Sequence, residues 1–209
     1  MRIIAIVIIS FCLSACLFPV KPGPHLGHFE EQAPNVGEPA PRFTLANLDG
    51  EAVSLDSLIG EKPIVLQIGS HSCPVYRFRR FSMRRLHEKY KDDVTFLLIY
   101  VQEAHPVGSN SPYVDKEWVS FWNKIPGVLI PQHKSHEERL EQARQSKEKL
   151  QKYYKYTYLV DDINNTVWTD YGSASSPAFV IDTNGDVALK QVWVRPGKID
   201  KVLSELLDV

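Results

Sequence analysis

The chain has 209 residues, of which 44% are hydrophobic and 23% are charged, and its formal net charge is -1. This length and composition are typical of one globular domain with a sizeable core. The near balance of charge offers nothing to attract a polyanion, so we expect no nucleic-acid partner.

The first residues indicate export. A short basic start, Met1 and Arg2, precedes an apolar run over 3–11 that is too short to span a membrane. Residues 13–16, LSAC, resemble the bacterial lipoprotein box, in which the cysteine becomes the lipidated first residue. We therefore predict a signal peptide over 1–15 and a lipid on Cys16; the alternative is a plain signal peptide or a short anchor in which Cys16 is incidental. The expected location is the periplasmic side of a membrane, and we favour the outer membrane.

This expectation decides how the three cysteines are used. Cys12 would be removed with the signal peptide and Cys16 would be blocked by lipid, which leaves Cys73 as the one free thiol. A disulfide framework is thereby excluded. Residues 17–41 hold six of the fourteen prolines, so we predict a lipidated, extended tether over 16–41 and a single domain over 42–209.

The domain opens with a predicted hairpin over 41–55, which turns at Asp49 and Gly50. Two continuous apolar runs of strand length follow at 64–69 and 94–101. Between them, residues 75–90 contain no Gly or Pro and predict a helix with Pro74 at its first position. Strand, helix and strand at this spacing predict a parallel βαβ unit buried on both faces.

Cys73 stands where the first of these strands leads into the helix. Backbone N–H groups and the positive end of the helix dipole would favour its thiolate, so we predict a nucleophile. The alternative is that Cys73 is a small buried hydrophobic residue. Arg77, Arg80 and Arg84 share a helix face, which we interpret as solvated rather than as a charge acting on the thiol.

The second half of the domain begins with a long irregular stretch over 103–135, rich in Pro and Gly, which is typical of a functional or mobile loop. Its aromatic residues either fasten the loop to the body or face a substrate; these are Trp118, Phe121 and Trp122. A capping box of Ser135 and Glu138 starts a predicted helix over 135–154. Later elements are a strand at 156–160, a hairpin of 178–182 with 187–194, and a helix at 199–207.

This order predicts an α/β, thioredoxin-like fold with an N-terminal β-hairpin extension and a long inserted loop. Pro177 stands at the position of the cis-proline that faces the reactive cysteine in that fold, and we expect a cis bond there. Tyr76 occupies the place of a second cysteine, which excludes exchange within a Cys-x-x-Cys pair. The peroxiredoxin motif is matched in part, since Ser70 can stand for its Thr while Leu66 replaces its Pro.

Several stretches between 64 and 182 resemble the iodothyronine deiodinase family. They are Gly-Ser-His-Ser-Cys-Pro at 69–74, Phe-Leu-Leu-Ile-Tyr-Val at 96–101 with Glu-Ala-His-Pro at 103–106, Gln-His-Lys at 132–134 before Glu-Glu-Arg at 137–139, and Asp161, Asn164–Asn165 and Tyr171–Gly172. The Glu-Ala-His-Pro motif is the specific part, because generic redoxins lack it. Cys73 takes the place of the family's selenocysteine, and Pro177 takes the place of an Arg.

The resemblance implies catalytic roles for Cys73, Glu103, His105 and His133, with a thiolate attacking a halogen and the histidines and Glu103 delivering a proton. We assign Ser70, Ser72 and Pro177 to substrate binding. His71 would either stabilise the thiolate as a cation or cap its loop. His133 and His136 have no evident third ligand, so we expect no metal.

The expected function is a membrane-tethered thiol oxidoreductase that reduces a halogenated aromatic compound or another thiol-reactive substrate. The alternatives are a one-cysteine thiol peroxidase acting on a peroxide and a non-enzymatic binding module. We expect no cofactor, an external thiol as the electron donor, and membrane attachment through the lipid; a homodimer is an open alternative.

Overall fold

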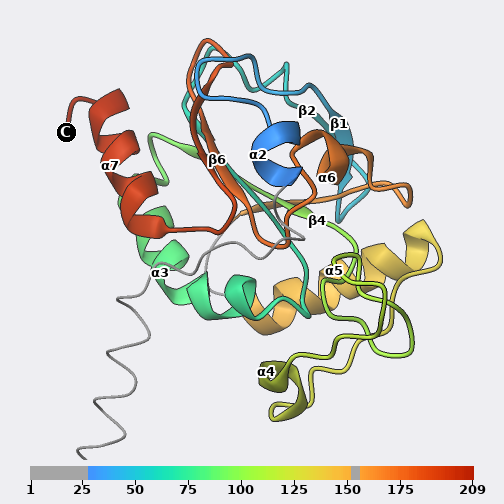
Figure 1. Ribbon diagram of the computed structural model, residues 1–209. Helices are drawn as coiled ribbons and strands as arrows, with labels where there is room; N and C mark the ends of the chain where they lie inside the picture. The colour runs from blue at the N-terminus through green and yellow to red at the C-terminus, as the bar shows by residue number, and fades with distance from the viewer. Residues whose placement is uncertain (1–27, 152–155) are drawn as a thin grey trace, which may run out of the picture.

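The computed structural model describes residues 28–151 and 156–209. Seven strands form one mixed sheet in the order β2-β1-β5-β4-β3-β6-β7 (Figure 1). The strands are β1 (Thr44–Asn47), β2 (Ala52–Ser54), β3 (Ile64–Gly69), β4 (Thr95–Tyr100), β5 (Thr157–Val160), β6 (Ala178–Ile181) and β7 (Val187–Gln191). The helices are α2 (His28–Gln32), α3 (Pro74–Tyr90), α4 (Phe121–Lys124), α5 (His136–Gln151), α6 (Thr166–Asp170) and α7 (Pro196–Leu206).

The predicted α/β architecture is confirmed. β3, β4 and β5 are parallel to one another, whereas β1 and β6 run antiparallel to the strands beside them. The βαβ unit consists of β3, α3 and β4, with Ile64 opposite Thr95 and Gly69 opposite Tyr100. This register brings the carboxyl ends of β3 and β4 to the same edge of the sheet.

Each strand of the centre alternates between two cores. Leu97 and Ile99 of β4 enter the core that α2 and α6 cover, whereas Phe96, Leu98 and Tyr100 enter the core beneath α3, α5 and α7. Figure 1 shows these two groups of helices on opposite faces of the sheet. A strand that is buried on both faces reads as a continuous apolar run, which explains why 64–69 and 94–101 could be recognised as strands.

The folded domain begins earlier than the predicted boundary at residue 42. Phe29 of α2 and Ala33 are buried in the core shared with α6, and the ring of Phe29 lies 6.1 Å from that of Phe179. Gly172 has a φ of +85°, and a Cβ there would meet the Cβ of Ala33 at 2.7 Å. The stretch 28–41, predicted as an extended tether, is therefore packed on the sheet. The predicted signal peptide, the lipid on Cys16 and the rest of the predicted tether lie outside the described residues.

Two further expectations differ from the structure. The peptide bond before Pro177 is trans, not cis. Pro177 still lies beside β3, because its carbonyl oxygen accepts the N–H of Ile68 at 3.1 Å. The long irregular stretch also contains the short helix α4, and α6 follows β5; helices of four and five residues are too short to show a periodic pattern.

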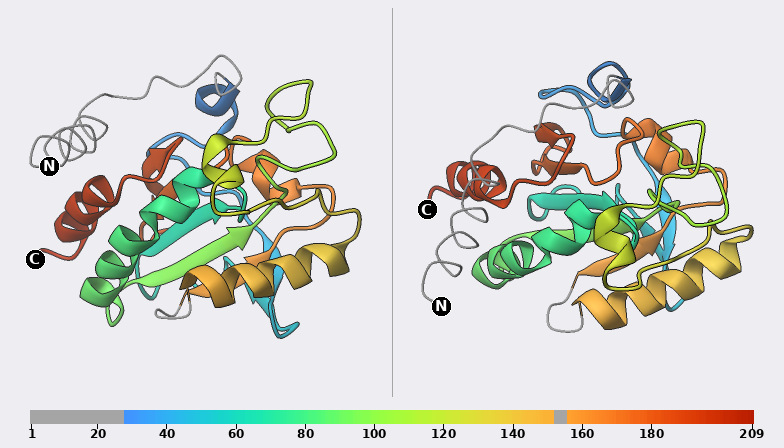
Figure 2. Two further views of the ribbon diagram at one scale, coloured as in Figure 1. Left: turned by 90° about the horizontal axis from the view of Figure 1, so that it is seen from below. Right: turned by 60° about the horizontal axis from the view of Figure 1, so that its bottom comes forward.

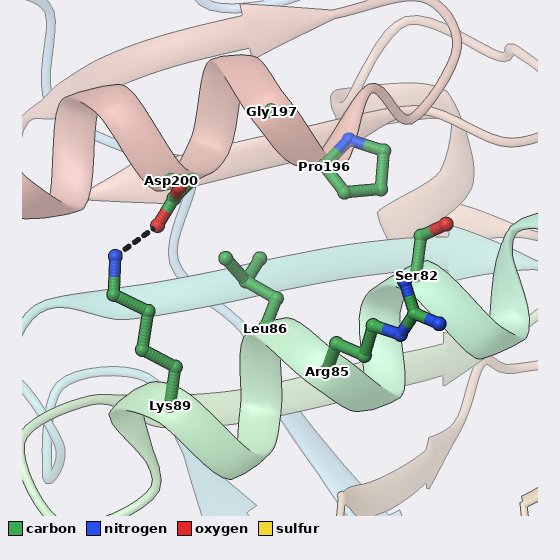
Figure 3. Close-up of a pocket in the computed structure, with 7 residues that line it drawn as sticks. All are labelled: Ser82, Arg85, Leu86, Lys89, Pro196, Gly197 and Asp200. Carbon is green, nitrogen blue, oxygen red and sulfur yellow. Dashed lines mark hydrogen bonds and ion pairs between the residues drawn. The ribbon is translucent and has the colours of Figure 1, made fainter.

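The last helix, α7, packs against α3 at the edge of the molecule. A shallow cavity of about 190 Å³ separates them, and Figure 3 shows the ion pair between Lys89 and Asp200 that bridges it, with 2.7 Å between nitrogen and oxygen. The hydroxyl of Tyr90 donates to the same carboxylate at 2.8 Å. Both contacts join α3 to α7 across the cavity. None of the described helices is both long and apolar enough to cross a lipid bilayer.

Candidate active site

Two loops that follow neighbouring strands form the candidate site. The loop after β3 carries Ser70, His71, Ser72 and Cys73, and the loop after β4 carries Glu103 to His105. Hydroxyl groups fasten these loops together: the Oγ of Ser70 accepts the N–H of Ala104 at 3.1 Å, and the Oγ of Ser72 accepts the N–H of His105 at 3.0 Å. The carboxyl edge of a parallel sheet is where active sites of α/β proteins lie.

Cys73 is a free thiol at the N-cap of α3, with Pro74 at the first helical position, as the sequence predicts. Its surroundings differ from the prediction, because the residue is only 1% exposed. Burial raises the pKa of the Cys73 thiol above its ordinary value. The N–H groups of Tyr76 and Val75, the Ser175 hydroxyl and Arg77 oppose that rise without cancelling it. Burial therefore acts against the low-pKa thiolate that the sequence predicts.

Arg77 is the second difference on this helix. Its side chain is buried rather than solvated, and its guanidinium donates to the Trp122 carbonyl oxygen at 2.9 Å and to the Oδ1 of Asn123. Asn123 in turn donates from Nδ2 to the Ser72 carbonyl oxygen at 2.8 Å. Figure 2 shows α4 beside the N-terminal end of α3, where these contacts form. Segment 106–131 is thus fastened to α3 and to the residue before the cysteine.

Glu103 is fully buried at the junction of the two loops. Its Oε2 accepts the backbone N–H of Ser72 at 2.7 Å, and its Oε1 accepts the hydroxyl of Tyr100. Burial raises the pKa of the Glu103 carboxyl, and the donors at Ser72, Tyr100 and Ser70 oppose that effect. A raised pKa keeps a carboxyl protonated to a higher pH than an exposed carboxyl, which is the direction that a general acid requires.

His133 is brought to this carboxyl from the far end of the long loop. Gln132 holds the approach, since its Oε1 accepts the N–H of Glu103 at 2.8 Å and its Nε2 donates to the Glu103 carbonyl oxygen at 3.2 Å. The Nε2 of His133 lies 3.6 Å from the Oε1 of Glu103. Burial, followed by the nearby charge of Arg139, lowers the pKa of His133 to about 4. At neutral pH the ring is therefore an uncharged neighbour of the carboxyl.

His105 also holds a neutral ring. Its Nδ1 lies 3.0 Å from the carbonyl oxygen of Trp118, which can only accept, so the Nδ1 carries the hydrogen and the Nε2 carries the lone pair. The Trp118 ring stands edge-on at 4.5 Å, with an interplanar angle of 83°. Burial lowers the pKa of His105 although the Trp118 carbonyl opposes it. In this state His105 can accept a proton at Nε2 but has none to give there.

The residues assigned to substrate binding are all buried: Ser70, Ser72 and Pro177. The two serine hydroxyls already accept backbone N–H groups of the neighbouring loop, so they position Glu103 and His105. A direct contact of the three with substrate stays a prediction. Among the residues assigned to catalysis, Glu103 and His133 lie in direct contact. Ser72, which precedes Cys73, contacts both Glu103 and His105.

The ring of His71 faces α5. Its Nδ1 lies 3.3 Å from the Nε2 of Gln142, and burial lowers its pKa to about 4, so the imidazolium alternative is not supported near neutral pH. His71 lines a cavity of about 420 Å³ between residues 126–131 and α5. An adjoining cavity of about 550 Å³ is lined by His133 and by Gln142 and Gln145, which border both. Because the two cavities share these lining residues, we refer to them together as the groove.

Sequence reasoning missed four residues that act on this site. Asn123 and Ser175 lie in irregular stretches with no motif around them, and Tyr100 and Gln132 are polar groups beside recognised motifs. Only Tyr100 and Gln132 could have been found from the sequence, because each is a polar residue within or next to a stretch that resembles the family. Asp161, by contrast, belongs to the resembling stretches but caps α6, accepting the N–H of Trp168 at 2.9 Å and of Val167 at 3.2 Å.

The chain was compared with known proteins by sequence. The profile of the family described as iodothyronine deiodinase matches residues 12–191. Thyroxine 5-deiodinase of Rattus norvegicus is 37% identical over 139 residues, which cover 64% of this chain and 40% of the relative. Thyroxine 5-deiodinase of Ovis aries is 31% identical over 178 residues, covering 82% of this chain and 54% of the relative. The chain thus spans about half the length of these curated relatives.

Solved structures were compared by shape. The thioredoxin domain of a thiol-disulfide oxidoreductase from Bacteroides vulgatus superposes with a TM-score of 0.56 at 14% identity, covering 81% of this chain and 98% of that one. A thioredoxin-like protein from Aeropyrum pernix gives 0.54 at 16% identity, covering 78% and 89%. At these identities the likeness concerns the fold alone, and it confirms the predicted thioredoxin-like fold.

Proposed function

Because the chain belongs to the iodothyronine deiodinase family, we propose that it is a thiol oxidoreductase that removes a halogen from an aromatic compound through Cys73. The observation that carries this proposal is the buried carboxyl of Glu103, joined to the cysteine loop by the N–H of Ser72 at 2.7 Å. The site would then hold a nucleophile and a proton donor on the adjoining ends of two strands.

The reaction would begin when the Cys73 thiolate attacks the halogen of an iodinated phenol. A sulfur–iodine bond forms, the carbon–iodine bond breaks, and the aromatic carbon takes up the electron pair and a proton. An external thiol then attacks the Cys73 sulfur and releases iodide, and a second thiol reduces the mixed disulfide. Overall, two thiols are oxidised to one disulfide while carbon–iodine becomes carbon–hydrogen.

Glu103 is the proposed source of that proton. The histidines are less suited to begin the step, because His105 and His133 both have lowered pKa values and are neutral near pH 7. Burial raises the pKa of the Glu103 carboxyl, so it holds a proton where an ordinary carboxyl would not. Tyr100 and His133 border its Oε1 and are placed to return a proton to it after the reaction. Of the histidines and the glutamate that the sequence suggests for proton delivery, Glu103 is therefore the proposed donor.

Substrate access requires segment 106–131 to move, since Cys73 is 1% exposed. Withdrawal of the segment that Asn123 fastens to Ser72 would hydrate the thiol and remove the burial that raises its pKa. The thiolate would then be favoured by the N–H groups of Val75 and Tyr76 and by Arg77, which remain on α3. Activation of the nucleophile would accordingly be coupled to opening.

The proposed substrate is a halogenated phenol without a required carboxylate. This restriction follows from Pro177, which stands where the family has an arginine to grip its ligand. Pro177 offers neither a charge nor a donor, and its carbonyl is already used by Ile68. The groove lined by His71 and His133 is the proposed place for the aromatic rings.

We further propose that the protein is exported and held at a membrane by a lipid on Cys16, facing the periplasm. The support is the sequence pattern of residues 1–16 described above. Mass spectrometry of the protein from membranes tests it: a mature chain beginning at a diacylated Cys16 is expected, and an unmodified Cys16 would contradict the proposal.

A thiol peroxidase is the second candidate. The observation that favours it is the cluster of donors around the sulfur, consisting of two N–H groups, the Ser175 hydroxyl and Arg77. The same donors would stabilise the oxygen that leaves when Cys73 attacks a peroxide and becomes a sulfenic acid. The two candidates differ in the atom that the sulfur attacks.

One assay distinguishes them. The full chain is incubated with dithiothreitol and either an iodinated phenol or hydrogen peroxide, and iodide release and peroxide loss are measured for the wild type and for Cys73→Ser. The proposal expects iodide release that is lost in the variant. Peroxide loss alone would establish the second candidate, and equal rates in both proteins would leave a binding function.

A further inference from the structure

The face formed by α3 and α4 exposes an unusual number of apolar side chains. Five of them are more than half exposed: Phe78, Phe81, Phe121, Trp122 and Ile125. The rings lie together, with Phe78 and Trp122 centred 5.5 Å apart and Phe121 and Trp122 5.6 Å apart. Large apolar side chains gathered on a surface indicate an interaction site rather than ordinary exposure.

Arginines stand among these rings. The guanidinium of Arg80 lies 4.2 Å from the centre of the Phe81 ring. Arg84 and Arg85, three and four residues after Phe81, share its side of the helix and are exposed. We call these five apolar residues and three arginines the aromatic–arginine surface.

The charge of this surface has one sign. Residues 74–87 contain five Arg and no Asp or Glu, and residues 118–136 contain two Lys and no Asp or Glu, although the whole chain has a net charge of -1. A flat, negatively charged surface would complement these basic residues. Most protein surfaces carry both signs of charge, whereas a layer of acidic phospholipid headgroups is uniformly negative and has an apolar layer beneath it.

We propose that the aromatic–arginine surface lies against an anionic phospholipid membrane, with the rings inserted at the level of the headgroups. Aromatic rings and long basic side chains are the groups that occupy this boundary, because their apolar parts enter the lipid while their polar ends stay in water. The proposal rests on the exposed side chains alone and requires neither the lipid on Cys16 nor the dehalogenation reaction.

The surface adjoins the candidate site. The guanidinium of Arg77 donates to the backbone of Trp122 at 2.9 Å, and Asn123 reaches the residue before Cys73. Insertion of the rings of α4 into the membrane would therefore displace the segment that Asn123 fastens beside the cysteine. A substrate dissolved in the membrane would reach the site at this boundary.

Quenching of tryptophan by brominated phospholipid tests the proposal on the full chain. Vesicles contain phosphatidylcholine brominated on its acyl chains, with or without phosphatidylglycerol, and the contribution of Trp122 is the difference between the wild type and Trp122→Phe. We expect that contribution to fall by at least about half on the anionic vesicles. On neutral vesicles the decrease in Trp122 fluorescence should be at least about threefold smaller, because these vesicles offer the arginines no anionic headgroups.

Matched variants locate the contact. Phe78→Ser with Phe81→Ser should abolish the quenching of Trp122, and Arg84→Glu with Arg85→Glu should reduce it by at least about threefold on anionic vesicles. The controls are Val36→Ser, an exposed apolar residue elsewhere, and Lys198→Glu with Lys201→Glu on α7. Both controls should leave the quenching unchanged, and circular dichroism verifies that every variant is folded.

Three outcomes would overturn the proposal. Trp122 could remain unquenched on anionic vesicles, or be quenched equally in the surface variants and the controls. Trp122 could also be shielded from acrylamide in the absence of any vesicle. That last result would mean that another part of the chain, a second copy or a bound protein already covers the rings.

Discussion

The side-chain amide of Asn123 donates to the backbone carbonyl of Ser72 at 2.8 Å, across 51 positions of the chain. The same side chain accepts the buried guanidinium of Arg77 through its Oδ1. A single asparagine therefore fastens segment 106–131 to the residue that precedes the cysteine. Removing the Asn123 side chain should loosen segment 106–131 while leaving the sheet and α3 in place.

Asn123→Ala should make Cys73 more reactive. Without the amide, the carbonyl of Ser72 and the guanidinium of Arg77 lose a buried partner, which costs about 1–3 kcal/mol of closed-state stability. We expect the rate of Cys73 alkylation by iodoacetamide at pH 8 to rise by about tenfold. Asn110→Ala, in the same segment but bonded only to exposed Asp115, is the control. An unchanged rate in Asn123→Ala would show that the segment does not limit access.

The pH dependence of the same alkylation should reflect burial of the thiol. Because the pKa of Cys73 is raised, the rate should have its midpoint above the value of about 8.5 of a free cysteine. Ser175→Ala removes a donor that lowers this pKa, so its midpoint should lie higher still. Ser173→Ala, two residues away, serves as the control. A wild-type midpoint below that of a free cysteine would mean that the helix terminus outweighs burial.

His71 should contribute to acid destabilisation. Its pKa is about 4 in the folded protein against 6.5 when exposed, so between these values the unfolded chain binds more protons and stability rises with pH. On lowering the pH from 7 to 5, this group should cost about 1–2 kcal/mol of unfolding free energy. Urea unfolding of His71→Gln should show a correspondingly smaller loss.

Two comparisons make the His71 result specific. His133, whose pKa is also about 4, contributes in the same direction and stays in both proteins, so the loss should be reduced rather than abolished. Glu103, with a raised pKa, acts in the opposite direction and cancels in the difference. His28→Gln, an exposed histidine, should match the wild type. An identical loss in His71→Gln and the wild type would contradict the assignment.

Gly172→Ala should destabilise the fold through α2. The position has a φ of +85°, and the added Cβ would meet the side chains of Ala33 at 2.7 Å and Phe29 at 2.9 Å. We expect a loss of about 3 kcal/mol in the free energy of unfolding. Gly60→Ala has a φ of +96° with nothing within 4 Å, so strain alone should cost about 1 kcal/mol. Equal costs would mean that α2 does not pack on the sheet.

The sequence predicted the centre of the fold because its residues carry strong local signals. β3 and α3 are recognisable from an apolar run and an uninterrupted helix, and the turns at Gly50 and Gly185 mark the hairpins. α2 lay hidden in a proline-rich stretch, because a helix of five residues with one buried side chain, Phe29, has no period to detect.

The candidate site was predictable to the extent that a motif marks it. Glu103, His105 and His133 were found by resemblance. No local sequence pattern indicates that Gln132 binds the backbone of Glu103 and brings His133 to its carboxyl group. The burial of the Arg77 side chain could not be predicted from a motif. Arg77 repeats the pattern of Arg80 and Arg84 along α3, and only the fold of segment 106–131 distinguishes the arginine that it covers.

The central claim is that Cys73 attacks the substrate while Glu103 supplies the proton. The most direct test is a single turnover with an iodinated phenol and no external thiol, in which dehalogenated product and modified Cys73 are counted together. The account predicts one product for each Cys73 consumed, and a rate in Glu103→Gln at least about a hundredfold lower while Cys73 alkylation and Glu138→Gln stay near wild type. Product formed without consumption of Cys73, or at full rate in Glu103→Gln, would contradict it.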